Sequence, residues 1–307
     1  MNQPISGTIV GVAGPVVIAE GLGGVRMYDV VHAGHIRLVG EVIRLSGDLT
    51  TIQAYEDTRG LRVGEPVTNS GGPFMVELGP GLLGSILDGV QRPLPTLREQ
   101  QGEFIARGGT ALALDRQRVW DFEPRVEVGN QVSGGDLLGI VRETPHLEHR
   151  VLVPPDVCGV VEDIRSGQYT VEQTVAVVSA EEPVLRSSKG QAHHKRSSAV
   201  ELAMMQRWPA RQPRPHHGKL DPTGPLITGQ RVVDTFFPIP KGGAAIIPGG
   251  FGTGKTVLQH TLAKWADADI IVYVGCGERG NEMTDVLEEF PRLEDPHTGG
   301  PLMDRTV

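Results

Sequence analysis

Eight consecutive residues have the types and spacing of a phosphate-binding loop. The segment Gly249-Gly250-Phe251-Gly252-Thr253-Gly254-Lys255-Thr256 fits the pattern G-x-x-x-x-G-K-[ST]. Its glycines let successive backbone N–H groups point into one concavity, where they and the N-terminus of the next helix bind anionic oxygens. Lys255 would reach the β- and γ-phosphates, and the Thr256 hydroxyl would ligate a bridging Mg²⁺. The segment therefore predicts nucleotide binding.

A second group of reactive side chains follows the apolar run at residues 270–274. It is Gly275-Cys276-Gly277-Glu278-Arg279-Gly280-Asn281-Glu282-Met283. Because ligands of open α/β sheets bind beyond the carboxyl ends of the strands, we expect Glu278 and Arg279 to face the same crevice as Lys255. Glu278 could then orient an attacking water in line, and Arg279 could pair with Glu278 or neutralise phosphate charge. The alternative is an ordinary surface salt bridge.

The elements that would position these residues form an α/β block beginning near Asp221. Residues 244–248 read as the strand that leads into the loop, and residues 270–274 as a parallel strand covered on both faces. Apolar spacing predicts a helix after each segment, the second stopped by Pro291. The residues expected to pack are Val257, Leu258, Thr261, Leu262 and Trp265 of the first helix, with Trp265 in the core, and Met283, Val286, Leu287 and Phe290 of the second.

The first 72 residues read as a small β-barrel, because short apolar runs recur about every ten residues with Gly and Pro between them. Such a barrel could bind oligonucleotides or tie subunits into a ring, and its even mixture of charges favours the second. A connector follows at residues 73–108, with at most a short helix around Leu82 to Leu87. The expected strands are Ile5–Val10, Val16–Ala19, Val25–Val31, Gly40–Leu45 and Thr50–Ala54.

Residues 109–185 form a second β-rich block, in which the run 126–141 is answered by the run 151–161. Two such halves resemble the barrel-sandwich of biotinyl and lipoyl carriers. A carrier needs a lysine at the tip between the halves, and residues 145–149 contain none. We therefore reject a swinging-arm role and interpret the block as a structural insertion. His146 and His149 at the tip could bind a metal, but a solvated loop is the simpler interpretation.

Residues 186–220 are basic and poor in apolar side chains, which predicts a flexible linker over most of their length. A basic contact with a partner is the alternative. The remaining residues, 221–307, are the expected partial nucleotide-binding domain. The fold class is thus multidomain β plus α/β.

Composition narrows the choice of partners. The chain has 307 residues, 39% apolar and 21% charged, with a formal charge of −8. That charge argues against a general nucleic-acid or anionic-membrane surface. The two distant cysteines, Cys158 and Cys276, suggest a reducing cytoplasm. No run approaches the roughly 18 apolar residues of a membrane span, so we expect any membrane link to come through other subunits.

Several of these stretches together resemble the catalytic A subunit, or alpha chain, of the V/A-type rotary ATPases. The phosphate loop with Phe251 inside it and the β-rich insertion separate the chain from F-type catalytic subunits. The matching segments are residues 79–94, Leu152-Val153-Pro154-Pro155-Asp156-Val157, the loop at 249–256, residues 273–283, and Asp295-Pro296-His297-Thr298-Gly299-Gly300-Pro301-Leu302-Met303.

The resemblance implies a subunit that alternates with a non-catalytic B subunit in a hexameric ring. It implies ATP synthesis or hydrolysis coupled, through central-stalk and peripheral-stalk subunits, to proton or sodium transport by a membrane rotor. In family terms Lys255 and Thr256 hold the phosphates and Mg²⁺ of ATP or ADP, Glu278 positions the water, and Arg279 contacts phosphate. The expected location is cytoplasmic, peripheral to the cell membrane through the assembled complex.

The chain also departs from the family. Residues 187–200 have no counterpart that we can place, and the sequence ends at Val307, where family members continue for a similar length. We therefore expect an N-terminal fragment that is inactive alone. One rival is a catalytically dead assembly or nucleotide-binding module. Another is a hexameric helicase or secretion-system ATPase, which predicts no insertion at residues 109–180.

Overall fold

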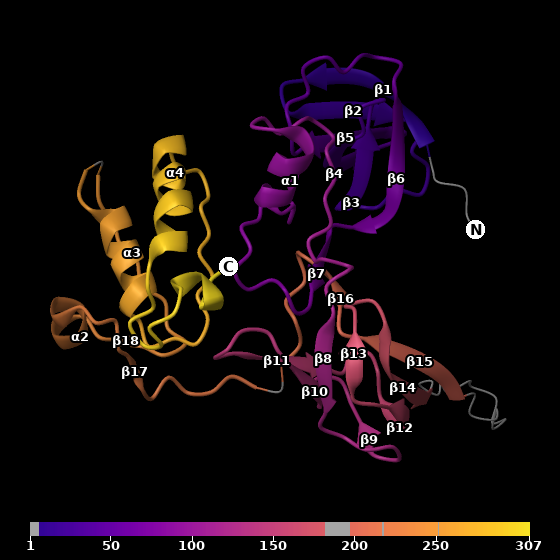
Figure 1. The fold of residues 1–307 in the computed structure, drawn as a ribbon. Helices are drawn as coiled ribbons and strands as arrows, with labels where there is room; N and C mark the ends of the chain where they lie inside the picture. Colours follow the sequence, from indigo (N-terminus) through magenta and orange to yellow (C-terminus); the bar gives the residue numbers. More distant parts are fainter. Residues whose placement is uncertain (1–5, 182–196, 217, 251) are drawn as a thin grey trace. The chain divides into compact units, whose positions relative to one another are not determined.

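The computed structural model describes residues 6–181, 197–216, 218–250 and 252–307, and these fall into two compact units. The first unit comprises residues up to 78, residues 87–113 and residues 207–213. The second comprises residues 79–86, 114–206 and 214–307. Figure 1 labels their helices and strands.

The first unit is built on a closed barrel, as expected, with strand order β1-β2-β5-β4-β3-β6 and antiparallel pairing throughout. Alternate residues point inward, so the interior is apolar and includes Ile9, Val17 and Ile52, each 0% exposed. The strands are β1 (Ser6–Ala13), β2 (Val16–Glu20), β3 (Asp29–Ala33), β4 (Leu38–Ser46), β5 (Leu49–Ala54) and β6 (Pro66–Pro73). The third begins at Asp29 rather than Val25, because Tyr28 lies in a left-handed turn.

The connector contains a helix, but it lies outside Leu82 to Leu87, where the sequence allowed at most a short one. Residues 82–87 contain a turn at 83–84 and no helix, and the helix is α1 (Leu94–Gln101). Pro93 at the N-cap and Pro95 in the first turn fit a helix start, where the missing N–H of proline has no cost. Gly81 and Gly84 have positive φ, which prevents a helix through the earlier segment.

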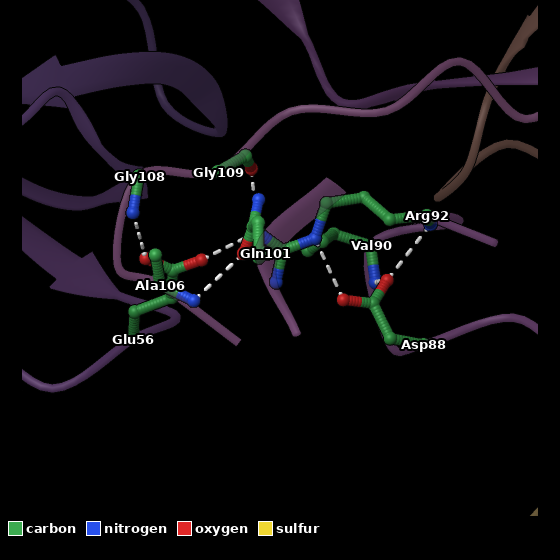
Figure 2. Close-up of polar contacts among 8 residues, drawn as sticks. All are labelled: Glu56, Asp88, Val90, Arg92, Gln101, Ala106, Gly108 and Gly109. Atoms are coloured by element: carbon green, nitrogen blue, oxygen red, sulfur yellow. Dashed lines mark hydrogen bonds and ion pairs between the residues drawn. The ribbon is translucent and has the colours of Figure 1, made fainter. Parts of the chain in front are cut away.

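Arg92 fastens this connector within its unit, and Figure 2 shows its contacts. Its side chain is 11% exposed and bonds Asp88 Oδ2 at 2.7 Å, Glu56 Oε1 at 2.6 Å and the Gly109 carbonyl at 2.6 Å. Glu56 also accepts the Gly108 N–H at 2.6 Å. One guanidinium thus joins the end of β5 to both ends of residues 87–113.

The second unit contains the insertion, two four-stranded antiparallel sheets ordered β11-β10-β8-β13 and β15-β14-β12-β9. A shared apolar core lies between them and includes Phe122, Leu138, Val161 and Val178. The strands are β8 (Trp120–Pro124), β9 (Gln131–Val132), β10 (Leu137–Arg142), β11 (Glu148–Leu152), β12 (Gly159–Ile164), β13 (Gly167–Tyr169), β14 (Thr174–Glu181) and β15 (Ser197–Ala203).

Strand β15 corrects the prediction of a flexible linker. Residues 197–203 pair along the whole of β14, and Leu202 and Met204 are buried in the sandwich core. Val200, Leu202 and Met204 alternate with less buried residues, a period of two that the basic surroundings obscured. The linker prediction for residues 186–196, and most of the unplaced segment 187–200, lies outside the described residues.

After β15 the chain returns to the first unit. Strand β16 (Gln206–Pro209) pairs with β7 (Met75–Leu78), the strand by which the chain left it. Arg211 then bonds both carboxylate oxygens of Glu41, a barrel residue with a 2% exposed side chain, with Nε 2.7 Å from Oε1. These contacts hold residues 207–213 within the first unit.

The C-terminal part of the second unit carries helices but little sheet. Its elements are β17 (Pro225–Leu226), α2 (Arg231–Phe236), β18 (Ile239–Pro240), α3 (Lys255–Trp265), α4 (Gly280–Glu289) and the 3₁₀ turns η1 (Phe290–Arg292) and η2 (Leu302–Arg305). Helices α3 and α4 appear where the apolar spacing predicted them. Val286 and Phe290 are buried, as expected.

The two predicted strands are not formed as such. Residues 244–248 are irregular, with Ile246 85% exposed, and residues 270–274 make only one parallel bridge, between Ile271 and Thr306. A parallel strand forms only when a neighbouring strand pairs with it. Within the described residues, 270–274 have one short neighbour at Thr306, and 244–248 have none. For the same reason α3 has no buried residue, and Trp265, predicted to be core, is 45% exposed.

None of the helices in the described ranges combines the length and the apolar character needed to cross a bilayer.

Candidate functional site

The phosphate loop leads directly into α3. Gly252 and Gly254 have φ values of 76° and 81°, in the left-handed region that glycine adopts without strain. Gly254 is the N-cap of the helix, and Lys255 is its first residue. The backbone therefore turns at the glycines so that the helix N-terminus, with its unpaired N–H groups and positive dipole end, faces the loop. Phe251 lies outside the described residues.

The Lys255 ammonium is folded into the loop. It donates to the carbonyls of Gly249 at 2.6 Å and Gly250 at 2.7 Å, and the Thr253 hydroxyl also donates to Gly250 O at 2.9 Å. A Cβ atom on Gly249 would lie 2.5 Å from Thr253 Oγ1, so only glycine permits this compact arrangement. A polyphosphate bound in the loop would compete with these two carbonyls for the ammonium protons.

Thr256 lies in the first turn of α3 and is half-buried. Among the described contacts, none engages its hydroxyl. The first turn of α3 carries no acidic side chain, which leaves the positive end of the helix dipole uncompensated by the helix itself. These residues fit an Mg²⁺-phosphate group, in which Thr256 would supply one oxygen ligand.

Glu278 and Arg279 lie just before α4, after the segment that pairs with Thr306. Glu278 is half-buried, and its Oε2 has no hydrogen-bond partner in the described part of the chain. Arg279 is exposed and forms the N-cap of α4. Burial raises the pKa of Tyr273, and the negative charges of Glu278 and Glu282 raise it further, which places both carboxylates near that phenol.

No hydrogen bond or ion pair in the described ranges joins Glu278 to Lys255. The expected convergence of Lys255, Thr256, Glu278 and Arg279 on one phosphoryl group therefore stays a prediction. An orphaned carboxylate oxygen is costly to bury, which is consistent with a group that meets its partner only when a ligand binds.

Sequence reasoning missed several residues that support the site. His260 of α3 packs edge-on against Phe290, with ring centroids 5.3 Å apart, and Tyr273 lies 5.1 Å from the same ring. Arg305 and Asp295 form a buried ion pair, and Arg305 contacts the last turn of α3. The sequence signal for the pair was weak: Arg305 stands among Leu302, Met303 and Thr306, a setting typical of a buried turn.

The structure places one of the two histidines at the insertion tip beside a single carboxylate. His149 Nδ1 lies 3.2 Å from Glu143 Oε2, so its ring is engaged in a structural contact. Among the residues that the structure describes, no group of three or more His, Cys, Asp or Glu side chains could hold a metal ion.

A β-barrel, a barrel-sandwich insertion and a glycine loop that turns into a helix beginning at Lys255 together define a multidomain protein of the P-loop nucleotide-binding class. Three family models match these parts in the same order. They are the ATP synthase alpha/beta family β-barrel domain over residues 9–71, the ATP synthase alpha/beta subunit barrel-sandwich domain over 111–211, and the ATP synthase alpha/beta family nucleotide-binding domain over 229–307. The chain belongs to the ATP synthase alpha/beta family.

Curated relatives show which subunits of this family the chain is similar to. The chain is 55% identical over 308 residues to the A subunit of the A-type ATP synthase of Methanopyrus kandleri, covering 100% of the chain and 50% of that protein. It is 56% identical over 301 residues to the V-type ATP synthase alpha chain of Acetivibrio thermocellus, covering 98% and 49%. The V-type ATP synthase alpha chain of Anaeromyxobacter dehalogenans is 54% identical over 303 residues, covering 99% and 49%. The chain thus spans about half the length of the curated relatives it matches.

Proposed function

We propose that this chain supplies the barrel, the insertion and the phosphate-binding part of the nucleotide site in the catalytic A subunit of a rotary ATP synthase or ATPase. The observation that carries the proposal is the loop at residues 249–256, in which the Lys255 ammonium is turned inward at the N-terminus of α3. In addition, subunits of A-type and V-type ATP synthases are similar to this chain over almost its whole length.

The proposed reaction is in-line transfer of the terminal phosphoryl group of ATP to water, or its reverse. Lys255 and the loop N–H groups hold the β- and γ-phosphates, and Thr256 supplies a ligand to Mg²⁺, which neutralises developing charge when bound. Glu278 accepts a hydrogen bond from the attacking water and fixes its direction. Arg279 contacts phosphate and offsets its charge.

The proposed setting is a complex. The chain alternates with a non-catalytic B subunit in a hexameric ring, contacts central-stalk and peripheral-stalk subunits, and lies at the cytoplasmic side of a membrane. ATP turnover is coupled there to proton or sodium movement through a separate membrane rotor. The barrel suits a ring contact, because its described strands fill its interior with their own apolar side chains and leave no space there for a ligand strand.

The test is Glu278→Gln in a complex of the catalytic subunit with its B subunit, with Glu288→Gln as the matched control. Glu288 is an exposed residue of α4 with no described partner. We expect Glu278→Gln to retain Mg-ATP binding and to lose about 10²-fold or more in hydrolysis, because orientation of the water is lost. Equal hydrolysis by both variants would contradict the role of Glu278. Absence of nucleotide turnover in the unaltered complex would favour an assembly module without catalysis.

A further inference from the structure

Two charged side chains are buried together beside the C-terminal end of α3. Arg305 is 6% exposed and Asp295 is 2% exposed, and Arg305 Nη2 lies 3.1 Å from Asp295 Oδ1. Asp295 also accepts the His297 N–H at 3.1 Å and the Thr298 hydroxyl at 2.9 Å. Charged groups are rarely buried this deeply unless they are paired, and removal of one partner would leave the other buried without a counter-charge.

The Arg305 guanidinium closes the C-terminal end of the phosphate-loop helix. Nη1 donates to the Ala268 carbonyl at 2.6 Å, and Nη2 donates to the Lys264 carbonyl at 3.3 Å, in the last turn of α3. The last carbonyls of a helix lack partners within it and carry the negative end of its dipole. A buried cation there fixes the end of α3 opposite to Lys255.

The backbone of the same residue holds the segment that leads to Glu278. Ile271 N–H donates to the Arg305 carbonyl at 2.8 Å, and Val307 N–H donates to the Ile271 carbonyl at 2.9 Å. Arg305 therefore contacts both segments that carry the proposed site, α3 through its side chain and Ile271 through its main-chain carbonyl. Asp295 fixes the side chain that makes the first contact.

We propose that Asp295 and Arg305 are a positioning pair, which sets the placement of α3 relative to residues 271–276 and thereby that of Lys255 relative to Glu278. The inference rests on the proposed function, because it concerns the same phosphate site. Neither residue touches phosphate: α3 has 11 residues and is about 16 Å long, so Arg305 acts through the helix.

The geometry requires a guanidinium. Its planar fork donates at once to a helix carbonyl, a loop carbonyl and a carboxylate, in fixed directions. Lysine keeps the charge but concentrates it at one atom. Arg305→Lys therefore tests whether the guanidinium geometry is needed or whether a positive charge is enough. Asp295→Asn removes the negative charge with little change in shape. Arg292→Lys is the matched control, because Arg292 is exposed in η1 with no described partner.

The placement can be measured without nucleotide. Spin labels at the exposed Cys276 and at Gln259→Cys, in a Cys158→Ser background, report the distance between residues 271–276 and α3 by double electron–electron resonance. We expect one narrow distance distribution in the parent and in Arg292→Lys. We expect a clearly broader distribution in Arg305→Lys and Asp295→Asn. Distributions as narrow as that of the parent in both variants would overturn the inference.

The consequence for the site is measured with the unlabelled chain and a fluorescent ATP analogue in Mg²⁺. Misplacement of about 1 Å is enough to weaken the arrangement strongly, so we expect affinity to fall about tenfold in Arg305→Lys and Asp295→Asn but not in Arg292→Lys. Broadened distances with unchanged affinity would show a purely structural pair and overturn the positioning role. A parent that does not bind the analogue would refute the proposed function, while the distance measurement would still decide whether the pair places the two segments.

Discussion

At the scale of single residues, the loop chemistry depends on backbone conformation as much as on side-chain type. Lys255 reaches the Gly249 and Gly250 carbonyls because Gly252 and Gly254 turn the chain through the left-handed region. The two kinds of glycine differ in what they contribute. Gly254 supplies an unusual φ, whereas Gly250 lies outside that region and has open space around its Cα.

Gly254→Ala is therefore expected to weaken Mg-nucleotide binding, whereas Gly250→Ala is not. A Cβ atom at a left-handed position costs about 1–2 kcal/mol, which corresponds to roughly tenfold in affinity if the loop must rearrange. Titration of both variants with a fluorescent nucleotide checks this. A Cβ atom would meet open space at either position, so equal losses would contradict the role assigned to the positive φ of Gly254.

At the scale of elements, buried charges hold the connector and the insertion in place. Arg92 links Glu56, Asp88 and the Gly109 carbonyl, and Glu143 links the insertion to residues 81–83 of its own unit. Both groups lie away from water. Their removal therefore leaves partners that cannot be solvated, which is more costly than loss of a surface ion pair.

Arg92→Met should lower the free energy of unfolding of the first unit by about 3 kcal/mol, because it leaves two partly buried carboxylates without their cation. Arg98→Met is the control: the Arg98–Glu103 pair has side chains 71% and 72% exposed, and such pairs contribute about 0–1 kcal/mol. Urea unfolding measures both. Similar values for the two variants would contradict a structural role for Arg92.

Because of Glu143, we expect the stability of the second unit to fall at acid pH. Burial raises the pKa of its carboxyl, but hydrogen bonds from His149 and from the Gly81 and Leu83 N–H groups outweigh burial and hold that pKa below its ordinary value of 4.5. Stability from these bonds is therefore complete above pH 4.5 and is lost as the pH falls through the folded-state pKa.

Glu143→Gln should thus be less stable than the parent at pH 6 and should lose less stability between pH 6 and acid conditions. Urea unfolding followed across this range gives the comparison. A variant with the same acid dependence as the parent would show that another carboxyl controls it.

Local patterns predicted the barrel, α3, α4 and the loop, because turn glycines and apolar periods encode them directly. The sequence allowed at most a short helix at residues 82–87, and none forms because Gly81 and Gly84 adopt positive φ. Strand β15 was missed because its apolar alternation lies in a basic stretch. Strands at 244–248 and 270–274 were overpredicted because apolar runs show burial propensity but not the neighbours that pair with them. Arg305 was missed because burial of a charge depends on tertiary contacts.

At the scale of the whole molecule, the parts of the chain differ in how many of their apolar side chains are buried. The barrel and the sandwich each enclose an apolar core, whereas Val257 of α3 and Val272 and Val274 of the segment before Glu278 are 70%, 69% and 74% exposed. Under the proposed function this chain contributes the phosphate-binding elements, and we expect its binding to depend on the polyphosphate rather than on the base.

The most direct test of that claim is a calorimetric titration of the chain with Mg-tripolyphosphate, compared with adenosine. The account predicts saturable binding of tripolyphosphate and none of adenosine, with loss of about 2–3 kcal/mol of binding free energy in Lys255→Ala because charge-assisted contacts are removed. Lys219→Ala, which alters an exposed lysine, should bind like the parent. Binding that is equal in the parent and Lys255→Ala, or that adenosine supports as well as tripolyphosphate, would contradict the assignment of the loop.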